Sequence, residues 1–153
     1  MRRMDMSLEI AEIIQLALAP AFLLVGIGQF LQLAAGRLAR VVDRARAVAA
    51  MLPEVPGPEH DMLVGELKKL DRRMNVVNWA IFFGTASMIA VCLVVALLFL
   101  TSWMAVDLSL TIAASFIGVM ALLIPGLILF LWEVLLAYRT IHVRTDIVGH
   151  NIL

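Results

Sequence analysis

Residues 16–46 read LALAPAFLLVGIGQFLQLAAGRLARVVDRAR, and this stretch decides the fold. The 24 residues from Ile13 to Gly36 carry no charge. As a helix they extend about 36 Å, at about 1.5 Å per residue, which is enough to cross a hydrocarbon core of about 30 Å. Four arginines follow, and each would cost roughly 2.5–3.5 kcal/mol at the centre of a span. The stretch therefore predicts a membrane span that continues into a basic helix.

The composition of the whole chain agrees with a membrane protein. Of its 153 residues, 63% are hydrophobic and 16% are charged, and the mean hydropathy is +0.99. Soluble domains have about 45–50% apolar and about 25% charged residues. Twelve basic and twelve acidic residues cancel, so nothing indicates a nucleic-acid partner. Cys92 is the single cysteine, which excludes an intramolecular disulfide, and we expect it to be a small buried hydrophobe.

Two further apolar runs complete the prediction of an all-α integral membrane protein, a single membrane domain of residues 1–153. We expect its three transmembrane helices at about 8–36, 78–102 and 108–135. Trp79 and Trp103 flank the second span, where indole rings usually mark the two interfaces. Pro20 in the first span and Pro125 in the third predict kinks, because proline removes a backbone hydrogen bond.

Spans one and two are expected to extend into an antiparallel helical hairpin at about 37–77. Apolar residues in its first arm recur at helical spacing, and those in its second arm repeat as in the seam of a coiled coil. The second-arm residues are Leu63, Leu67, Leu70, Met74 and Val77. Pro53, Pro56 and Gly57 predict the turn between the arms.

The uneven placement of positive charge predicts the orientation. Eight Lys and Arg residues lie between spans one and two, and two more lie in the tail 136–153. Only Arg2 and Arg3 lie on the other side. By the positive-inside rule, the hairpin and the tail are cytoplasmic and the N-terminus is outside.

One face of the first span is small and polar. Its members recur at spacings typical of one helix stripe, with Gln32 beside them: Glu12, Gln15, Ala19, Gly26 and Gln29. One interpretation is a packing seam, in which glutamine side chains hydrogen-bond a neighbouring helix. The other is an ion channel, in which copies of this face line a path for a monovalent cation or a proton and Glu12 forms a carboxylate ring at its mouth. Three spans are too few to enclose a path alone, so a channel predicts a homo-oligomer.

Glu133 lies near the inner end of the third span, where an unpaired carboxylate would be costly. Arg37 and Arg40 leave the membrane at a similar depth, so we predict an ion pair between Glu133 and one of them. The same two arginines, with Arg72 and Arg73, are candidates for contact with anionic lipid headgroups. A scaffold whose cytoplasmic hairpin binds such lipid or a protein partner is the alternative to a channel.

No motif indicates an enzyme. The chain has no H-E-x-x-H, no nucleophile elbow and no phosphate-binding glycine loop. His60, His142 and His150 lack the spacing of metal ligands. We therefore expect no catalytic residues, no metal and no cofactor, and we expect the lipid bilayer and further copies of the chain as partners.

Several of these segments together resemble a known family. They are Pro20 with the apolar run after it, the RLAR of residues 37–40, Asp43-Arg44, the LDRR of residues 70–73, and the FLWEV of residues 130–134 with Ala137. In these segments the chain is similar to the bacterial membrane proteins catalogued as domain of unknown function 2721. The resemblance covers nearly the whole chain. It implies a multi-span protein of the bacterial inner membrane and no catalytic residues to carry over.

Overall fold

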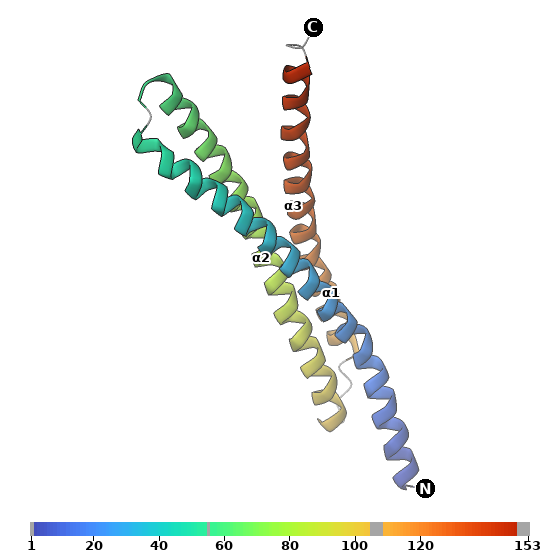
Figure 1. Cartoon of the computed structure of the whole chain (residues 1–153). Helices are drawn as coiled ribbons and strands as arrows, with labels where there is room; N and C mark the ends of the chain where they lie inside the picture. The colour runs from blue at the N-terminus through green and yellow to red at the C-terminus, as the bar shows by residue number, and fades with distance from the viewer. Residues whose placement is uncertain (1, 55, 105–108, 150–153) are drawn as a thin grey trace. The chain divides into compact units, whose positions relative to one another are not determined.

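The computed structural model describes residues 2–54, 56–104 and 109–149, with side chains at 15, 17–53, 56–100 and 110–137. All of the regular structure in these residues is helical (Figure 1). The elements in chain order are α1 (Arg2–Met51), the short 3₁₀ helix η1 (Leu52–Glu54), α2 (Pro58–Met104) and α3 (Ser109–Gly149).

Three of these helices are long and apolar enough to cross a membrane. The candidate spans lie within Ala17–Met51, Pro58–Leu100 and Leu110–Ala137. The prediction of an all-α chain with three such helices is therefore confirmed. Helix α1 passes from its apolar part into its basic part without interruption, because no proline or glycine occurs between Arg37 and Met51.

The chain divides into two compact units, and all three long helices contribute to each. The first unit comprises Met1–Leu33 and Phe82–Pro125, and the second comprises Ala34–Ile81 and Gly126–Leu153. Each unit has its own core.

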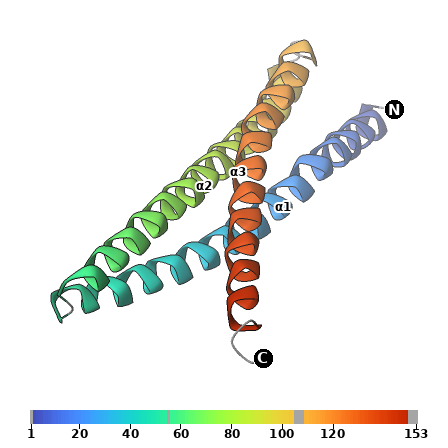
Figure 2. The same ribbon diagram turned by 90° about the horizontal axis from the view of Figure 1, so that it is seen from above.

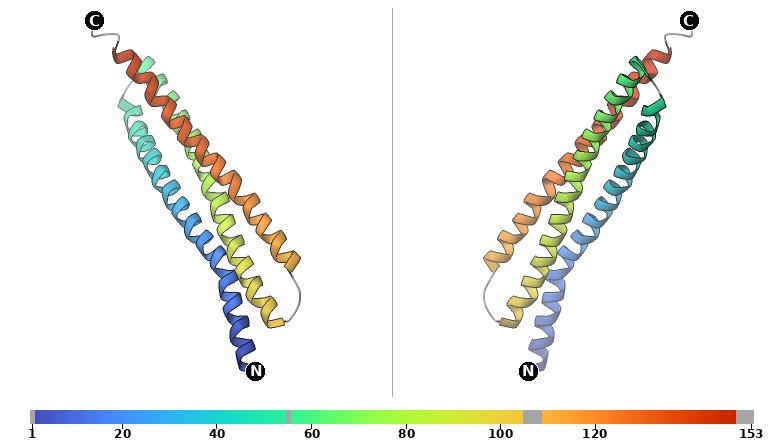
Figure 3. Two further views of the ribbon diagram at one scale, coloured as in Figure 1. Left: turned by 90° about the vertical axis from the view of Figure 1, so that its right-hand side faces the viewer. Right: turned by 90° about the vertical axis from the view of Figure 1, so that its left-hand side faces the viewer.

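Aliphatic side chains from all three helices form the core of the first unit. Ile27, Val91, Val94 and Val119 are each at most 2% exposed. In this unit the end of α2 and the start of α3 run side by side (Figures 2 and 3). Cys92 follows Val91 directly but is exposed, so the expectation that it is buried is wrong. Adjacent residues point to different faces of a helix, and α2 turns the Val91 face toward the core.

In the second unit, the end of α1 and the start of α2 lie side by side and antiparallel (Figures 1 and 3). Their shared core consists of Val41, Ala45, Val48 and Leu70. Leu63, Leu67 and Met74 pack against it, as the three-four repeat of the second arm predicts. These residues hold the two helix segments together.

The turn between α1 and α2 depends on glycine and proline. Gly57 has a φ of +84°, a left-handed conformation that favours glycine. Pro58 then begins α2, a position where proline's missing N–H costs nothing. The backbone N–H of His60 donates to the carbonyl of Gly57 at 3.0 Å. The chain therefore reverses direction within a few residues.

Both prolines expected to cause kinks lie inside helices. Helix α1 continues through Pro20, and α3 continues through Pro125. A helix can continue past proline in a membrane where neighbouring groups satisfy the freed carbonyl. Bending at these two positions stays a prediction.

A surface ion pair also joins the two arms in the second unit. Arg44 donates from Nη2 and Nε to one oxygen of Glu66, at 2.7 and 2.9 Å. The two side chains are 55% and 39% exposed, so water screens their attraction. We expect Arg44→Gln to change the free energy of unfolding by less than about 1 kcal/mol. Denaturation in detergent micelles measures this, and a larger loss would contradict the surface assignment.

Candidate functional site

The most unusual feature of the second unit is a buried carboxylate held by two arginines from two other helices. The Glu133 side chain on α3 is 1% exposed. Arg37 of α1 donates from Nη1 to Glu133 Oε2 at 3.0 Å, and Arg73 of α2 donates from Nη2 to Glu133 Oε1 at 2.7 Å. We call Arg37, Arg73 and Glu133 the ion cluster. It links all three helices of this unit.

Helix periodicity explains why these two arginines face inward. Arg37 lies three residues after Ala34 and four before Val41, and both of these neighbours are buried. Arg73 has the same relation to Leu70 and Val77, which are also buried. Each arginine therefore belongs to the packed face of its own helix, and the carboxylate of Glu133 meets both.

An aromatic ring on α3 also contacts the guanidinium group of Arg37. The guanidinium carbon of Arg37 lies 5.6 Å from the centre of the Phe130 ring. Phe130 precedes Glu133 by three residues on α3, so one face of α3 supplies both the carboxylate and the ring. The cation–π contact and the ion pair together orient the Arg37 side chain.

The ion cluster carries more positive than negative charge. Two guanidinium groups share one carboxylate, so the formal sum is +1 if all three groups are ionised. Glu133 uses one oxygen for each arginine, so neither arginine makes the two-bond fork that guanidinium and carboxylate can form. Consistently, Nε of Arg73 is buried and has no hydrogen-bond partner.

The structure contains the ion pair that the sequence predicts between Glu133 and one of Arg37 and Arg40, and it adds a second partner that the sequence did not predict. Glu133 is joined to Arg37, one of the two expected partners. Among the described side chains, Arg40 makes no ion pair with Glu133 and is exposed. The second partner is Arg73, which the sequence suggested only for headgroup contact. Its place between two seam positions, Leu70 and Val77, was the signal that could have identified it.

The polar face of α1 points away from the chain's own core. Gln15, Gly26, Gln29 and Gln32 are all exposed, and a Cβ built on Gly26 would meet nothing within 4 Å. Apart from Ala45, the described buried positions of α1 follow a different, seven-residue repeat: Pro20, Ile27, Ala34, Val41 and Val48. Glu12 and Trp103 lie outside the side chains that the structure describes. The described part of the polar face is therefore not a seam between helices of one chain.

The remaining candidates are spread over the second unit. Arg72 and Arg40 are exposed, whereas Arg37 and Arg73 belong to the ion cluster. Among the described residues, no group of three His, Cys, Asp or Glu side chains is arranged to hold a metal ion. His142 and His150 lie outside the described side chains.

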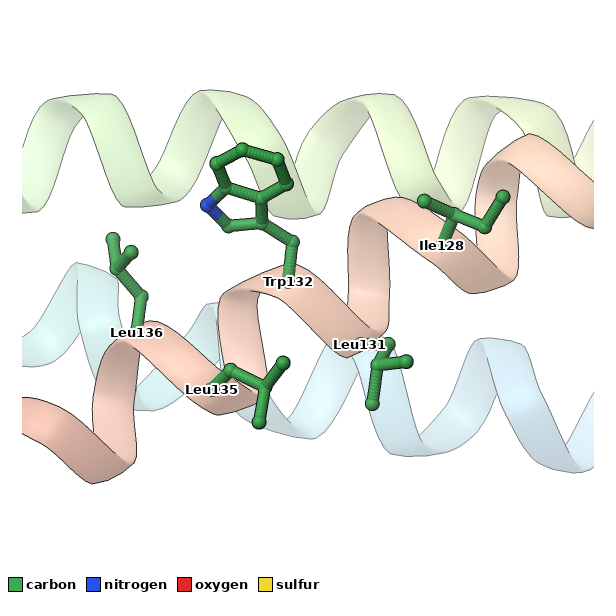
Figure 4. Close-up of a pocket in the computed structure, with 5 residues that line it drawn as sticks. All are labelled: Ile128, Leu131, Trp132, Leu135 and Leu136. Atoms are coloured by element: carbon green, nitrogen blue, oxygen red, sulfur yellow. The ribbon is translucent and has the colours of Figure 1, made fainter.

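A shallow apolar hollow of about 300 Å³ lies on α3 in the second unit. All five residues that line it come from this one helix, as Figure 4 shows: Ile128, Leu131, Trp132, Leu135 and Leu136. Each of these side chains is exposed, Trp132 by 61%. Such a face is suited to contact with lipid chains or with another apolar surface.

These features define an all-helical protein with three helices that could cross a membrane and a buried ion cluster that links them. The chain belongs to the family described as Protein of unknown function (DUF2721), and the match covers residues 17–143. The resemblance inferred from the sequence motifs is thus confirmed. The matched region includes the whole ion cluster but neither Glu12 nor Gln15. No curated protein and no solved structure matches the chain.

Proposed function

We propose that this chain forms a homo-oligomer in the bacterial inner membrane and that the polar face of α1 lines a path for a monovalent cation or a proton. The observation that carries the proposal is the exposure of Gln15, Gly26, Gln29 and Gln32. A glutamine amide that faced lipid chains would lose its hydrogen bonds to water at a cost of several kcal/mol. Another copy of the chain, or water held between copies, would supply the missing partners.

Large apolar side chains beside the polar residues support contact between copies. Phe22 is 74% exposed, Val25 63% and Leu33 54%, and all three lie within one or two helical turns of Gly26 and Gln29 on α1. Where helices associate in membranes, small residues allow close approach and polar residues form hydrogen bonds across the interface. The same α1 face could therefore pack through its apolar residues while its amides meet across an axis.

The proposal also assigns an orientation and a place for the α1–α2 hairpin. The hairpin and the C-terminal tail would be cytoplasmic, since ten of the twelve basic residues lie in those segments. The N-terminus would be outside. In this arrangement Arg37 marks the level at which α1 leaves the hydrocarbon core.

The test is ion flux in liposomes that contain the purified chain. We expect a monovalent-cation or proton flux that Gln29→Leu abolishes, because the substitution removes the amide and makes the path apolar. A suitable control is Asn78→Leu, which makes a comparable amide-to-leucine change at an exposed position on α2. This control should conduct like the wild type.

Three results would count against the proposal. A folded, inserted wild type that passes no ion under voltage or pH gradients would refute conduction. A stable monomer in detergent would refute the shared path. Equal loss of flux in Gln29→Leu and Asn78→Leu would show that the effect is not specific to the α1 face.

A further inference from the structure

The ion cluster has hydrogen-bond donors that the protein does not use. Each guanidinium carries several N–H donors on one plane, and the bonds to Glu133 use one nitrogen of each arginine. Nε of Arg73 is buried and also has no hydrogen-bond partner. Among the described residues, no second acidic side chain forms an ion pair with Arg37 or Arg73. The cluster is therefore short of acceptor oxygens.

The ion cluster has more hydrogen-bond donors than acceptors, and it is also partly accessible to solvent. Glu133 is sealed from solvent, but the side chains of Arg37 and Arg73 keep 31% and 24% of their surface exposed. Phe130 and Glu133 restrict the motion of Arg37, and Glu133 restricts that of Arg73. Two arginines that are held in fixed positions and are partly exposed lose little conformational entropy when they bind an anion.

The surroundings of the cluster match the headgroup level of a bilayer. Trp132 directly precedes Glu133 and is 61% exposed, and Trp79 is 50% exposed. Exposed indole rings are enriched at the boundary between lipid chains and headgroups. The uncharged part of α1 also ends at Arg37. The anion that is most concentrated at this level is the phosphate of a lipid headgroup.

We infer that the ion cluster binds the phosphate group of an anionic membrane lipid through the partly exposed side chains of Arg37 and Arg73. Arginine binds phosphate oxygens with two parallel hydrogen bonds, the arrangement that Glu133 leaves unused here. Glu133 acts as a positioning residue that holds the two guanidinium groups together. The inference requires a membrane location but does not depend on ion conduction.

The test compares lipid binding by two matched variants of the full-length chain. Native mass spectrometry of the detergent-solubilised protein measures affinity for phosphatidylglycerol and phosphatidylcholine. We expect the wild type to bind phosphatidylglycerol at least tenfold more tightly than phosphatidylcholine. Arg73→Gln should weaken phosphatidylglycerol binding about tenfold, because the charge of the cluster falls to zero while Glu133 keeps its bond to Arg37.

The control is Arg72→Gln, which removes the same charge from the next residue of α2. The sequence made Arg72 a candidate for headgroup contact, but Arg72 is exposed and lies outside the cluster, and our inference assigns the phosphate to the cluster. The loss of Arg72 should therefore change the affinity less than twofold. If Arg73→Gln does not fold, Arg73→Lys keeps the charge without the fork, and a loss of about threefold is expected. An unchanged affinity in Arg73→Lys would overturn the role of the fork.

Two further results would overturn the inference. Equal losses of phosphatidylglycerol affinity in Arg73→Gln and Arg72→Gln would mean that basic surface charge alone attracts the lipid. Displacement of phosphatidylglycerol by millimolar inorganic phosphate, with no preference for the lipid, would assign the site to free phosphate. Both results are independent of the ion-flux experiment.

Discussion

Replacing Glu133 with alanine is expected to lower the free energy of unfolding by about 3 kcal/mol. The substitution leaves Arg37 and Arg73 close together with no carboxylate between them. Removal of one member of a buried ion pair costs about 3–5 kcal/mol, chiefly because the remaining charge is buried and unpaired. We expect the lower end of this range, because both arginine side chains are partly exposed to solvent.

Denaturation in detergent micelles, followed by tryptophan fluorescence, measures this loss. The matched control is Glu66→Ala, which removes a carboxylate from the exposed pair with Arg44 and should cost less than about 1 kcal/mol. A variant with Leu at positions 37, 73 and 133 should recover much of the lost stability, since it buries no charge. A Glu133→Ala loss no larger than that of Glu66→Ala would contradict the buried ion cluster.

Gly84→Leu is the second substitution with a large expected effect. A Cβ at Gly84 would lie 2.8 Å from Leu31 Cδ2 and 2.8 Å from Phe30 Cε1, both in the first unit. Leucine adds three further carbons beyond that atom, so both neighbours must move. Overpacking of this kind costs about 1–3 kcal/mol, and we expect about 2 kcal/mol here.

The same denaturation experiment tests this expectation with Gly118→Leu as the control. A Cβ at Gly118 meets nothing within 4 Å, so leucine should fit there and gain about 0.5–1 kcal/mol from its higher helix propensity. Gly84→Ala should lie between the two leucine variants, because the ends of Leu31 and Phe30 are flexible. A neutral Gly84→Leu would show that α1 and α2 are not closely packed at this point.

Local sequence patterns were sufficient to predict the three long helices and the contact between the two arms. Uncharged runs such as 13–36 are long enough to cross a bilayer, and the three-four repeat from Leu63 to Met74 identifies the buried side of α2. Cys92 shows the limit of such patterns. Apolar composition identifies a membrane helix, but in a bilayer apolar residues lie both in the core and toward lipid, so composition alone does not indicate which side is buried.

The ion cluster shows the same limit at the candidate site. An unpaired carboxylate near the membrane is costly, so the sequence alone predicts that Glu133 pairs with an arginine. The expected depth of Arg37 and Arg40 in the membrane limited the choice to these two residues. The selection of Arg37, the addition of Arg73 and the contact with Phe130 depend on how the helices of the second unit are rotated about their axes. That rotation results from the packing of residues far apart in the chain, such as Val41 against Leu70. The sequence by itself determined which segments are helical and apolar, because length and periodicity act locally, and only the tertiary structure decided which charged side chains meet.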